Sequence, residues 1–188
     1  MRLSRVLEWA AIAVASLAVA FGAIALLSGF FAGRDQAGVG GAATLPGVAF
    51  ADLGDAHLSS GQHRPRYNSN PPTSGPHVPS PVTGEDRQLS NDQLLEALEL
   101  GDVVVMYGTQ APPAGLTTVL SSLAPPFTPA LAAAGQAVVI ARRPGTNGLT
   151  ALAWAHMLRV ASPHDPTLRT FIDYWLGRGA PAKTTAGP

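Results

Sequence analysis

The side chains of this chain that could do chemistry gather in one short segment. Residues 67–77 read Tyr-Asn-Ser-Asn-Pro-Pro-Thr-Ser-Gly-Pro-His. Three prolines and a glycine exclude a helix or a central strand, so we expect a rigid turn or polyproline-type loop that carries polar side chains at fixed angles. The predicted motif and binding surface consists of Tyr67, Asn70, Pro71, Pro72, Thr73, Ser74, Gly75 and His77.

Metal binding is the sharpest chemistry that these residue types permit. The candidate ligands are the imidazoles of His63, His77 and His156, with Met106 and Met157 as soft neighbours. Imidazole and thioether donors without cysteine favour copper outside the cytoplasm. Against this, no two histidines have the short spacing of a metal motif. A lone histidine on the apolar face of a strand, as predicted for His156, is usually a hydrogen-bonded core or edge residue.

Hydrolytic catalysis has weaker support. Ser74 and His77 superficially suggest a nucleophile and its base, but no Gly-x-Ser-x-Gly motif is present. The hydroxyls of Thr73 and Ser74 could equally bond backbone groups and fix the turn. Glu96 and Glu99 fall three apart on one side of a predicted helix, which is also common on a solvated face. No complete set of nucleophile, base and oxyanion donors can be assembled, so we expect no enzyme.

Composition narrows the class of protein further. The 188 residues carry 12 basic and 12 acidic side chains, so no basic field favours nucleic acid. Only 13% of the residues are charged, below the quarter typical of soluble domains. Cysteine is absent, which excludes a disulfide framework, a thiol nucleophile and a cysteine-ligated metal.

The first part of the chain predicts a membrane anchor. Residues 9–33 contain no charge, and a helix of that length covers the roughly 30 Å hydrocarbon core. Arg2 and Arg5 precede this run, so the positive-inside rule places residues 1–8 in the cytoplasm and the remainder outside it. The alternative is a cleaved signal peptide, whose apolar region is usually about 7–15 residues long. The expected membrane contact is therefore with the lipid bilayer through residues 9–33.

Composition also divides the remaining sequence. Residues 34–56 are glycine-containing and without periodicity, which indicates a flexible tether. An extracytoplasmic α/β domain is expected over 57–178, including a proline-rich loop over 63–90. Residues 179–188 are rich in Ala, Thr and Pro and are predicted to be a disordered tail.

Hydrophobic periodicity predicts the elements of the domain. Ser90 and Gln93 fit a capping box that starts a helix ending at Gly101. The sequence then predicts, in order, a buried strand over 103–107, a helix over 116–123, a helix over 128–135, a strand over 136–142, a strand over 150–160 and a helix from Asp165 to about residue 177.

This order predicts a small mixed sheet of three to four strands with packing helices, preceded by one transmembrane helix. The strands over 136–142 and 150–160 are joined by a short glycine-containing turn, so we expect them to pair antiparallel. A thioredoxin-like half would satisfy the same order, but without a Cys-x-x-Cys that comparison says nothing about redox chemistry.

The proline loop, followed by Leu98-Glu99-x-Gly101 and the strand over 103–107, resembles the bacterial family named domain of unknown function 3105. The resemblance implies one N-terminal membrane segment followed by an exported domain, with no established activity. Family members typically carry a histidine pair near the end of the first helix. Glu96 and Leu100 occupy those positions in this chain, while Glu99 remains. If the pair binds metal together with the loop histidine, Glu96 could still supply an oxygen and Leu100 could not.

The sequence therefore predicts a single-pass, membrane-anchored extracytoplasmic domain that acts as a binding or structural module of the bacterial envelope. Its expected partner is another envelope protein that contacts the proline loop and Glu99. No cofactor is required by this interpretation. The alternative is a site for copper or another metal that uses His63, His77 and, as a third candidate, His156.

Overall fold

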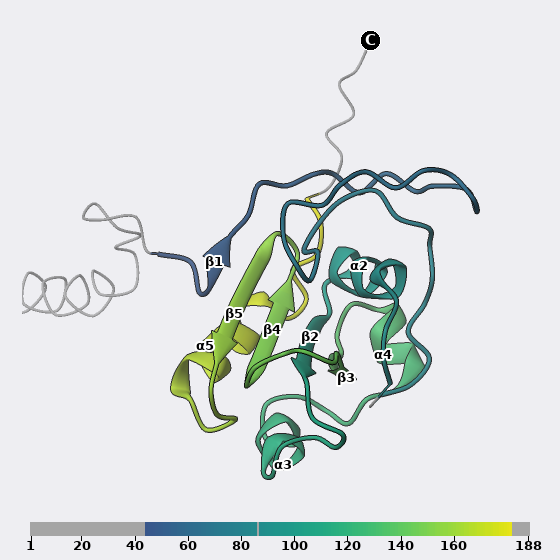
Figure 1. Cartoon of the computed structure of the whole chain (residues 1–188). Coiled ribbons are helices and arrows are strands. Elements are labelled where there is room, and N and C mark those ends of the chain that lie inside the picture. Colours follow the sequence, from purple (N-terminus) through teal and green to yellow (C-terminus); the bar gives the residue numbers. More distant parts are fainter. Residues whose placement is uncertain (1–43, 86, 182–188) are drawn as a thin grey trace, which may run out of the picture. The chain divides into compact units, whose positions relative to one another are not determined.

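A computed structural model of the protein describes residues 44–85 and 87–181 (Figure 1). The compact unit begins at Leu45. Its elements are β1 (Val48–Ala49), α2 (Asn91–Leu100), β2 (Val103–Tyr107), α3 (Leu116–Ser121), α4 (Pro129–Ala133), β3 (Val138–Arg142), β4 (Leu149–Ala153), β5 (His156–Val160) and α5 (Pro166–Trp175). Mixed α/β architecture is confirmed, with five strands in the described residues rather than three or four.

The five strands form one sheet in the order β1-β5-β4-β2-β3. β2 pairs in parallel with β3 and antiparallel with β4, and the β4–β5 and β5–β1 pairs are antiparallel. All five residues of β2 are buried. A strand that is apolar on both faces needs cover on both sides, which explains its interior place in the sheet.

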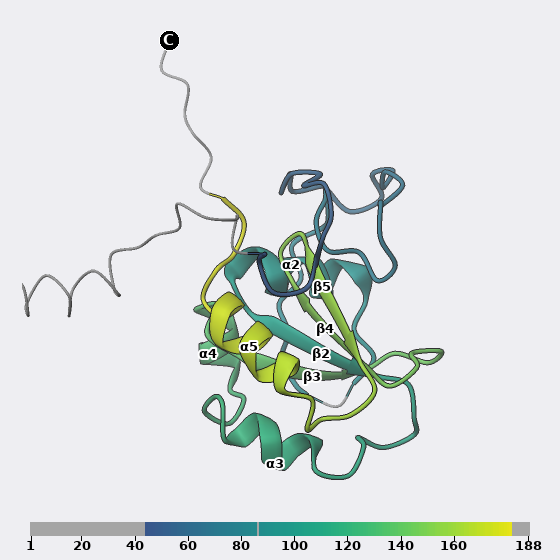
Figure 2. The same ribbon diagram turned by 90° about the vertical axis from the view of Figure 1, so that its left-hand side faces the viewer.

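Helices cover both faces of the sheet. α2 and α4 share one apolar cluster with Val104, Met106 and Leu152. α3 and α5 share the other cluster with Val105, Ile140 and other residues of the opposite strand faces. Figure 2 views the sheet from the side that α5 covers. The proline-rich segment joins the α2 side, because Tyr67 packs against that cluster.

The helix starts follow local chemistry and confirm the sequence predictions. Ser90 caps α2 by accepting from the backbone N–H of Gln93, and the Gln93 side chain accepts from the Ser90 N–H in return. Gly101 ends α2 with a φ of 115°, a left-handed conformation that glycine adopts without strain. At α5, the Asp165 carboxylate accepts from the Thr167 N–H and Pro166 occupies the first turn.

The predicted single strand over 150–160 is wrong, because the chain folds there into a tight hairpin of β4 and β5. Trp154 and Ala155 make the turn, and Ala155 has a φ of 57°. Neither residue is a usual turn former, so an apolar run concealed the reversal. The turn changes which residues share a face: Leu152 pairs with Met157, while His156 pairs with Ala153. His156 therefore does not share a face with Leu152.

The predicted antiparallel pairing of the strands on either side of residues 144–148 is also wrong. β2 lies between β3 and β4. The connection crosses the end of β2, where the Arg143 N–H donates to the Tyr107 carbonyl at 2.7 Å. A Cβ on Gly108 would lie 2.2 Å from the Thr146 carbonyl oxygen, so this close crossing requires glycine.

The segment predicted as a tether contributes to the folded unit. Val48 and Ala49 pair with β5, and the Phe50 N–H donates to the Ala155 carbonyl at 2.8 Å. The partners of its backbone hydrogen bonds are distant in the sequence, so local periodicity cannot reveal this pairing. The predicted membrane run 9–33 and most of the predicted tail lie outside the described residues. Within the described part of the chain, no helix has the length and apolarity that a bilayer crossing needs.

Candidate metal centre

The proline-rich segment is held by hydrogen bonds to its own backbone and to residues 51–53. The Tyr67 hydroxyl donates to the Pro76 carbonyl at 2.9 Å, and the Asn68 amide donates to the Ala51 carbonyl at 2.7 Å. The Ser74 hydroxyl accepts from the Leu53 N–H at 3.1 Å. Thr73 and Ser74 are buried. The polar side chains of the motif therefore fix the loop in place, and those of Thr73 and Ser74 do so from buried positions.

Two histidines from distant parts of the sequence meet at the end of this loop. The backbone N–H of His77 donates to the Ala56 carbonyl at 3.1 Å, and the backbone carbonyl of His77 accepts from the Leu58 N–H at 2.8 Å. This parallel bridge sets His57 beside His77, with ring centroids 5.4 Å apart. The neighbouring Val78 N–H donates to Asp92 at 3.1 Å, which fixes the loop against α2. The hydrogen bond from the Arg64 guanidinium is the main reason that the pKa of Asp92 lies below its usual value.

α2 brings two carboxylates to the same place. Glu96 and Glu99 lie three residues apart and so project from one side of the helix. Glu99 is in the last turn, where the helix dipole disfavours negative charge and no basic side chain follows. The Glu99 carbonyl accepts from the Ala180 N–H at 2.9 Å, so the C-terminal segment also holds this end of α2.

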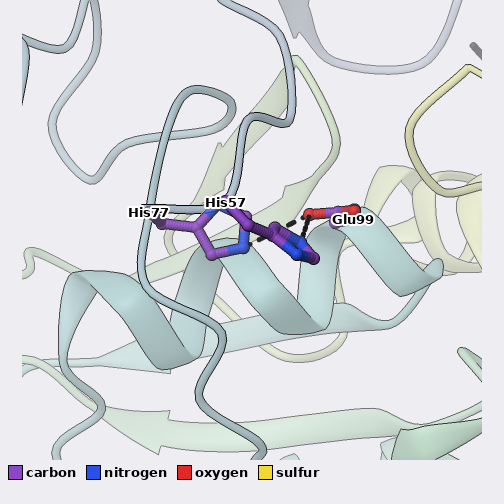
Figure 3. Close-up of side chains that lie close together, drawn as sticks. All are labelled: His57, His77 and Glu99. Atoms are coloured by element: carbon purple, nitrogen blue, oxygen red, sulfur yellow. Dashed lines mark hydrogen bonds and ion pairs between the residues drawn. The ribbon is translucent and has the colours of Figure 1, made fainter. Parts of the chain in front are cut away.

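The side chains of His57, His77 and Glu99 converge on one point (Figure 3). The Glu99 Oε2 atom lies 3.2 Å from His57 Nε2 and 3.3 Å from His77 Nε2. Glu96 Oε2 lies 3.5 Å from the same His77 nitrogen. One ligand atom from each of the first three residues lies within 4.8 Å of the others. Metal–ligand bonds of about 2.0–2.1 Å at tetrahedral angles put neighbouring donors roughly 3.3 Å apart, which matches the two distances from Glu99 to the histidine nitrogens.

The hydrogen bond of the second ring nitrogen orients His77. Nδ1 lies 3.0 Å from the Gly75 carbonyl oxygen. A carbonyl can only accept, so Nδ1 carries a hydrogen, and in a neutral ring Nε2 then presents its lone pair to the carboxylates. This arrangement, in which a backbone carbonyl fixes the ring that offers its other nitrogen to a metal, is usual for histidine ligands.

The two most enclosed atoms of the group have no hydrogen-bond partner among the described residues. They are His77 Nε2 and Glu96 Oε2, and they face each other. The His77 side chain is fully buried, Glu96 and Glu99 are 18% exposed and His57 is 49% exposed. A buried nitrogen lone pair facing a carboxylate is unfavourable unless a proton or a metal cation lies between them.

The structure separates the three histidines that the sequence proposed as ligands. His77 is in the group, whereas His63 is exposed and outside it. His156 lies elsewhere, with Nδ1 2.9 Å from the Trp154 carbonyl and its ring stacked on Trp175 at 3.9 Å. Met106 and Met157 pack in the apolar cluster on the α2 side of the sheet.

His57 is the member of this group that sequence reasoning missed. It lies 20 positions before His77 in an irregular segment, and no spacing rule joins the two. Glu96 and Glu99 were recognised as one helical side, but their meeting with the loop required the tertiary structure. The remaining motif residue with side-chain partners, Asn70, lies away from the histidines and bonds to Arg143 and Arg159 instead.

Comparison with known proteins supports the family suggested by the motif. The model of the family described as Protein of unknown function (DUF3105) matches residues 59–186. The chain belongs to this family. His77, Glu96 and Glu99 lie inside the DUF3105 match, and His57 lies just before it. No curated protein and no solved structure matches the chain.

Proposed function

We propose that this DUF3105 protein binds a first-row divalent metal ion through His57, His77 and Glu99, with Glu96 as a fourth donor. The observation that carries the proposal is the pair of buried atoms, His77 Nε2 and Glu96 Oε2, that face each other without a hydrogen bond. A cation bonded to both, and to the two neighbouring ligands, would satisfy all of them. It would also offset the negative charge at the end of α2.

The donor types favour zinc or copper. Imidazole suits Zn²⁺ and Cu²⁺, whereas Mg²⁺ and Ca²⁺ prefer sites made of oxygen alone. Neither methionine of the earlier copper hypothesis belongs to the ligand group, so the thioether argument for copper does not apply. For the same donors, Cu²⁺ binds more tightly than Zn²⁺, and availability decides which ion is held.

The proposed role is binding rather than catalysis. The Ser74 hydroxyl bonds to the backbone of residues 51 and 53 and is not directed at an imidazole. We also propose that the uncharged run 9–33 anchors the protein in the membrane and places the metal site outside the cytoplasm. The site would then hold metal at the outer surface of that membrane.

Competition titration against a chromophoric chelator tests the proposal on the purified full chain in detergent. We expect one equivalent of Zn²⁺ or Cu²⁺ to bind with a Kd below about 1 µM, or about 8 kcal/mol of binding free energy. Glu99→Gln keeps the shape of the side chain and removes its charge, and should weaken binding about 100-fold. His63→Gln removes an exposed histidine and is the matched control, with affinity unchanged within about twofold.

Two results would contradict the proposal. One is that neither Zn²⁺ nor Cu²⁺ binds at about 1 µM. The group would then be explained as a structural ion pair between a charged His77 and the carboxylates of Glu96 and Glu99. The other is an equal loss of affinity in Glu99→Gln and His63→Gln, which would indicate binding at exposed histidines in general.

A further inference from the structure

A polar cavity lies where the proline motif meets the sheet near Asn70. It has a volume of about 220 Å³, which corresponds to roughly seven waters at about 30 Å³ each. The lining residues that matter for the argument are Asn70, Arg143, Asn147, Thr150 and Arg159. We call this cavity the arginine pocket. It is smaller than the roughly 300–1,000 Å³ that drug-sized ligands occupy, so it suits a small molecule.

Four separate segments of the chain build the arginine pocket. Thr150 on β4 and Arg159 on β5 are directly paired across the two strands, so their side chains share a face. Arg143 comes from the connection that crosses the end of β2, and Asn70 comes from the proline motif. Thr150 is only 3% exposed and forms a buried part of the wall. The pocket therefore rests on the rigid sheet.

Asn70 holds both guanidinium groups in place. Arg143 Nη2 donates to the Asn70 side-chain oxygen at 2.9 Å, and Arg159 Nη2 donates to the Asn70 carbonyl at 3.0 Å. Arg143 Nη1 also donates to the Asn91 side chain at 3.2 Å. Each guanidinium carries five N–H donors, so most of the donors of both remain for a ligand or for water.

The pocket concentrates positive charge without an acid to balance it. Among the described residues that line it there is no Asp or Glu. Within the same part of the chain, neither Arg143 nor Arg159 has an ion-pair partner. Two fixed cations bonded to one residue repel each other, and arginine stays charged at any ordinary pH. Burial lowers the pKa of Arg143, in the direction expected for a cation removed from water.

We propose that the arginine pocket binds a small oxyanion, a carboxylate or a phosphate, through Arg143 and Arg159. Planar guanidinium groups match both anions with paired N–H···O bonds. The amide of Asn147 and the hydroxyl of Thr150 provide further polar contacts on the same walls. This site is separate from the metal centre in residues and in charge, so it does not depend on the proposed metal function.

Calorimetric titration of the metal-free full chain in detergent, at constant ionic strength, tests the proposal. The two probes are inorganic phosphate and malonate, and they distinguish the phosphate from the carboxylate class. We expect saturable binding of at least one probe at millimolar concentration or below. Arg159→Gln, at an exposed position, should weaken that binding about tenfold or more, because a charge-assisted contact is lost.

Arg169→Gln is the matched control, because Arg169 is an exposed arginine on α5 that does not line the pocket. It removes the same charge and should leave the affinity unchanged. Glu99→Gln should also leave it unchanged, which separates this site from the metal centre. The proposal fails if neither anion binds saturably up to about 10 mM. Such a result would mean a binding free energy weaker than about 3 kcal/mol. It also fails if Arg169→Gln weakens binding as much as Arg159→Gln.

Discussion

Four buried side-chain atoms have no hydrogen-bond partner in the described part of the chain, and they fall into two kinds. His77 Nε2 and Glu96 Oε2 face each other at 3.5 Å. His156 Nε2 belongs to a ring stacked on Trp175, and Asp102 Oδ2 belongs to a buried carboxyl whose other oxygen accepts from the Ala137 N–H. His77 and His156 make the same local hydrogen bond, from Nδ1 to the backbone carbonyl two residues earlier.

The difference between these regions shows what a buried polar atom needs. Burial alone favours the uncharged form of an acid: it raises the pKa of Asp102 to about 7. The His156 ring is held instead by stacking on Trp175. Two facing acceptors cannot both be accommodated in that way, and they need a proton or a metal cation between them. The same histidine chemistry therefore predicts a binding site at His77 and a packing residue at His156.

Exchanging the His77 ring for an apolar one should give the largest effect. His77→Phe removes a ligand and leaves Glu96 buried beside an uncharged ring. We expect metal binding to be lost, and the free energy of unfolding to fall by about 3–5 kcal/mol. Chelator competition and urea unfolding of the full chain in detergent measure the two effects. Retention of metal affinity within tenfold of the wild type would break the comparison.

The next largest effect is the contribution of Asp102 to the pH dependence of the free energy of unfolding. Its Oδ1 accepts from the Ala137 N–H at 2.8 Å, but burial dominates and raises the pKa from 3.8 to about 7. Between these values the folded state binds more protons than the unfolded state, so stability falls as pH rises from about 4 to about 7. A shift of about three units corresponds to a loss on the order of 4 kcal/mol.

Asp102→Asn should remove this dependence. The amide oxygen keeps the bond to Ala137, and no charge is buried above pH 7. We expect the variant to be more stable than the wild type at pH 8 and the difference to shrink toward pH 4. Urea unfolding followed by tryptophan fluorescence between pH 4 and pH 8 provides the measurement. A constant difference across that range would show that Asp102 does not titrate in it.

His156→Phe should have the smallest effect. The substitution keeps the stack on Trp175, removes the buried nitrogen without a partner and loses one hydrogen bond to Trp154. These changes oppose each other, so the free energy of unfolding should stay within about 1 kcal/mol of the wild type. Metal affinity should stay within twofold. A large loss of affinity would place His156 in the site and contradict its separation from His77.

The parts of the fold that the sequence predicted well have local causes. Ser90, Gln93 and Gly101 define α2 through contacts with near neighbours, and Asp165 with Pro166 defines the start of α5. The turn at Trp154 and Ala155 escaped prediction because its residues are apolar and its geometry is held by the strands on either side. β1 escaped because its pairing partner lies more than a hundred residues away.

The candidate site shows the same division. The proline motif, His77 and Glu99 were recognisable as unusual or as part of the family resemblance. His57 was not, because its place depends on a backbone bridge between two irregular segments. The arginine pocket had no sequence signal, since Arg143 follows β3 in a connection, Arg159 lies on β5, and both meet only through Asn70.

The graded exposure of the three proposed ligands has a consequence for the release of an ion. His57 is half exposed, Glu99 mostly covered and His77 fully enclosed. An ion bound here would be reached by solvent and by competing ligands from the His57 side. A partner's donor group would therefore replace His57 first, and His77 would be the last to release the ion. We therefore expect a chelator in solution to remove the ion from the His57 side without unfolding of the domain.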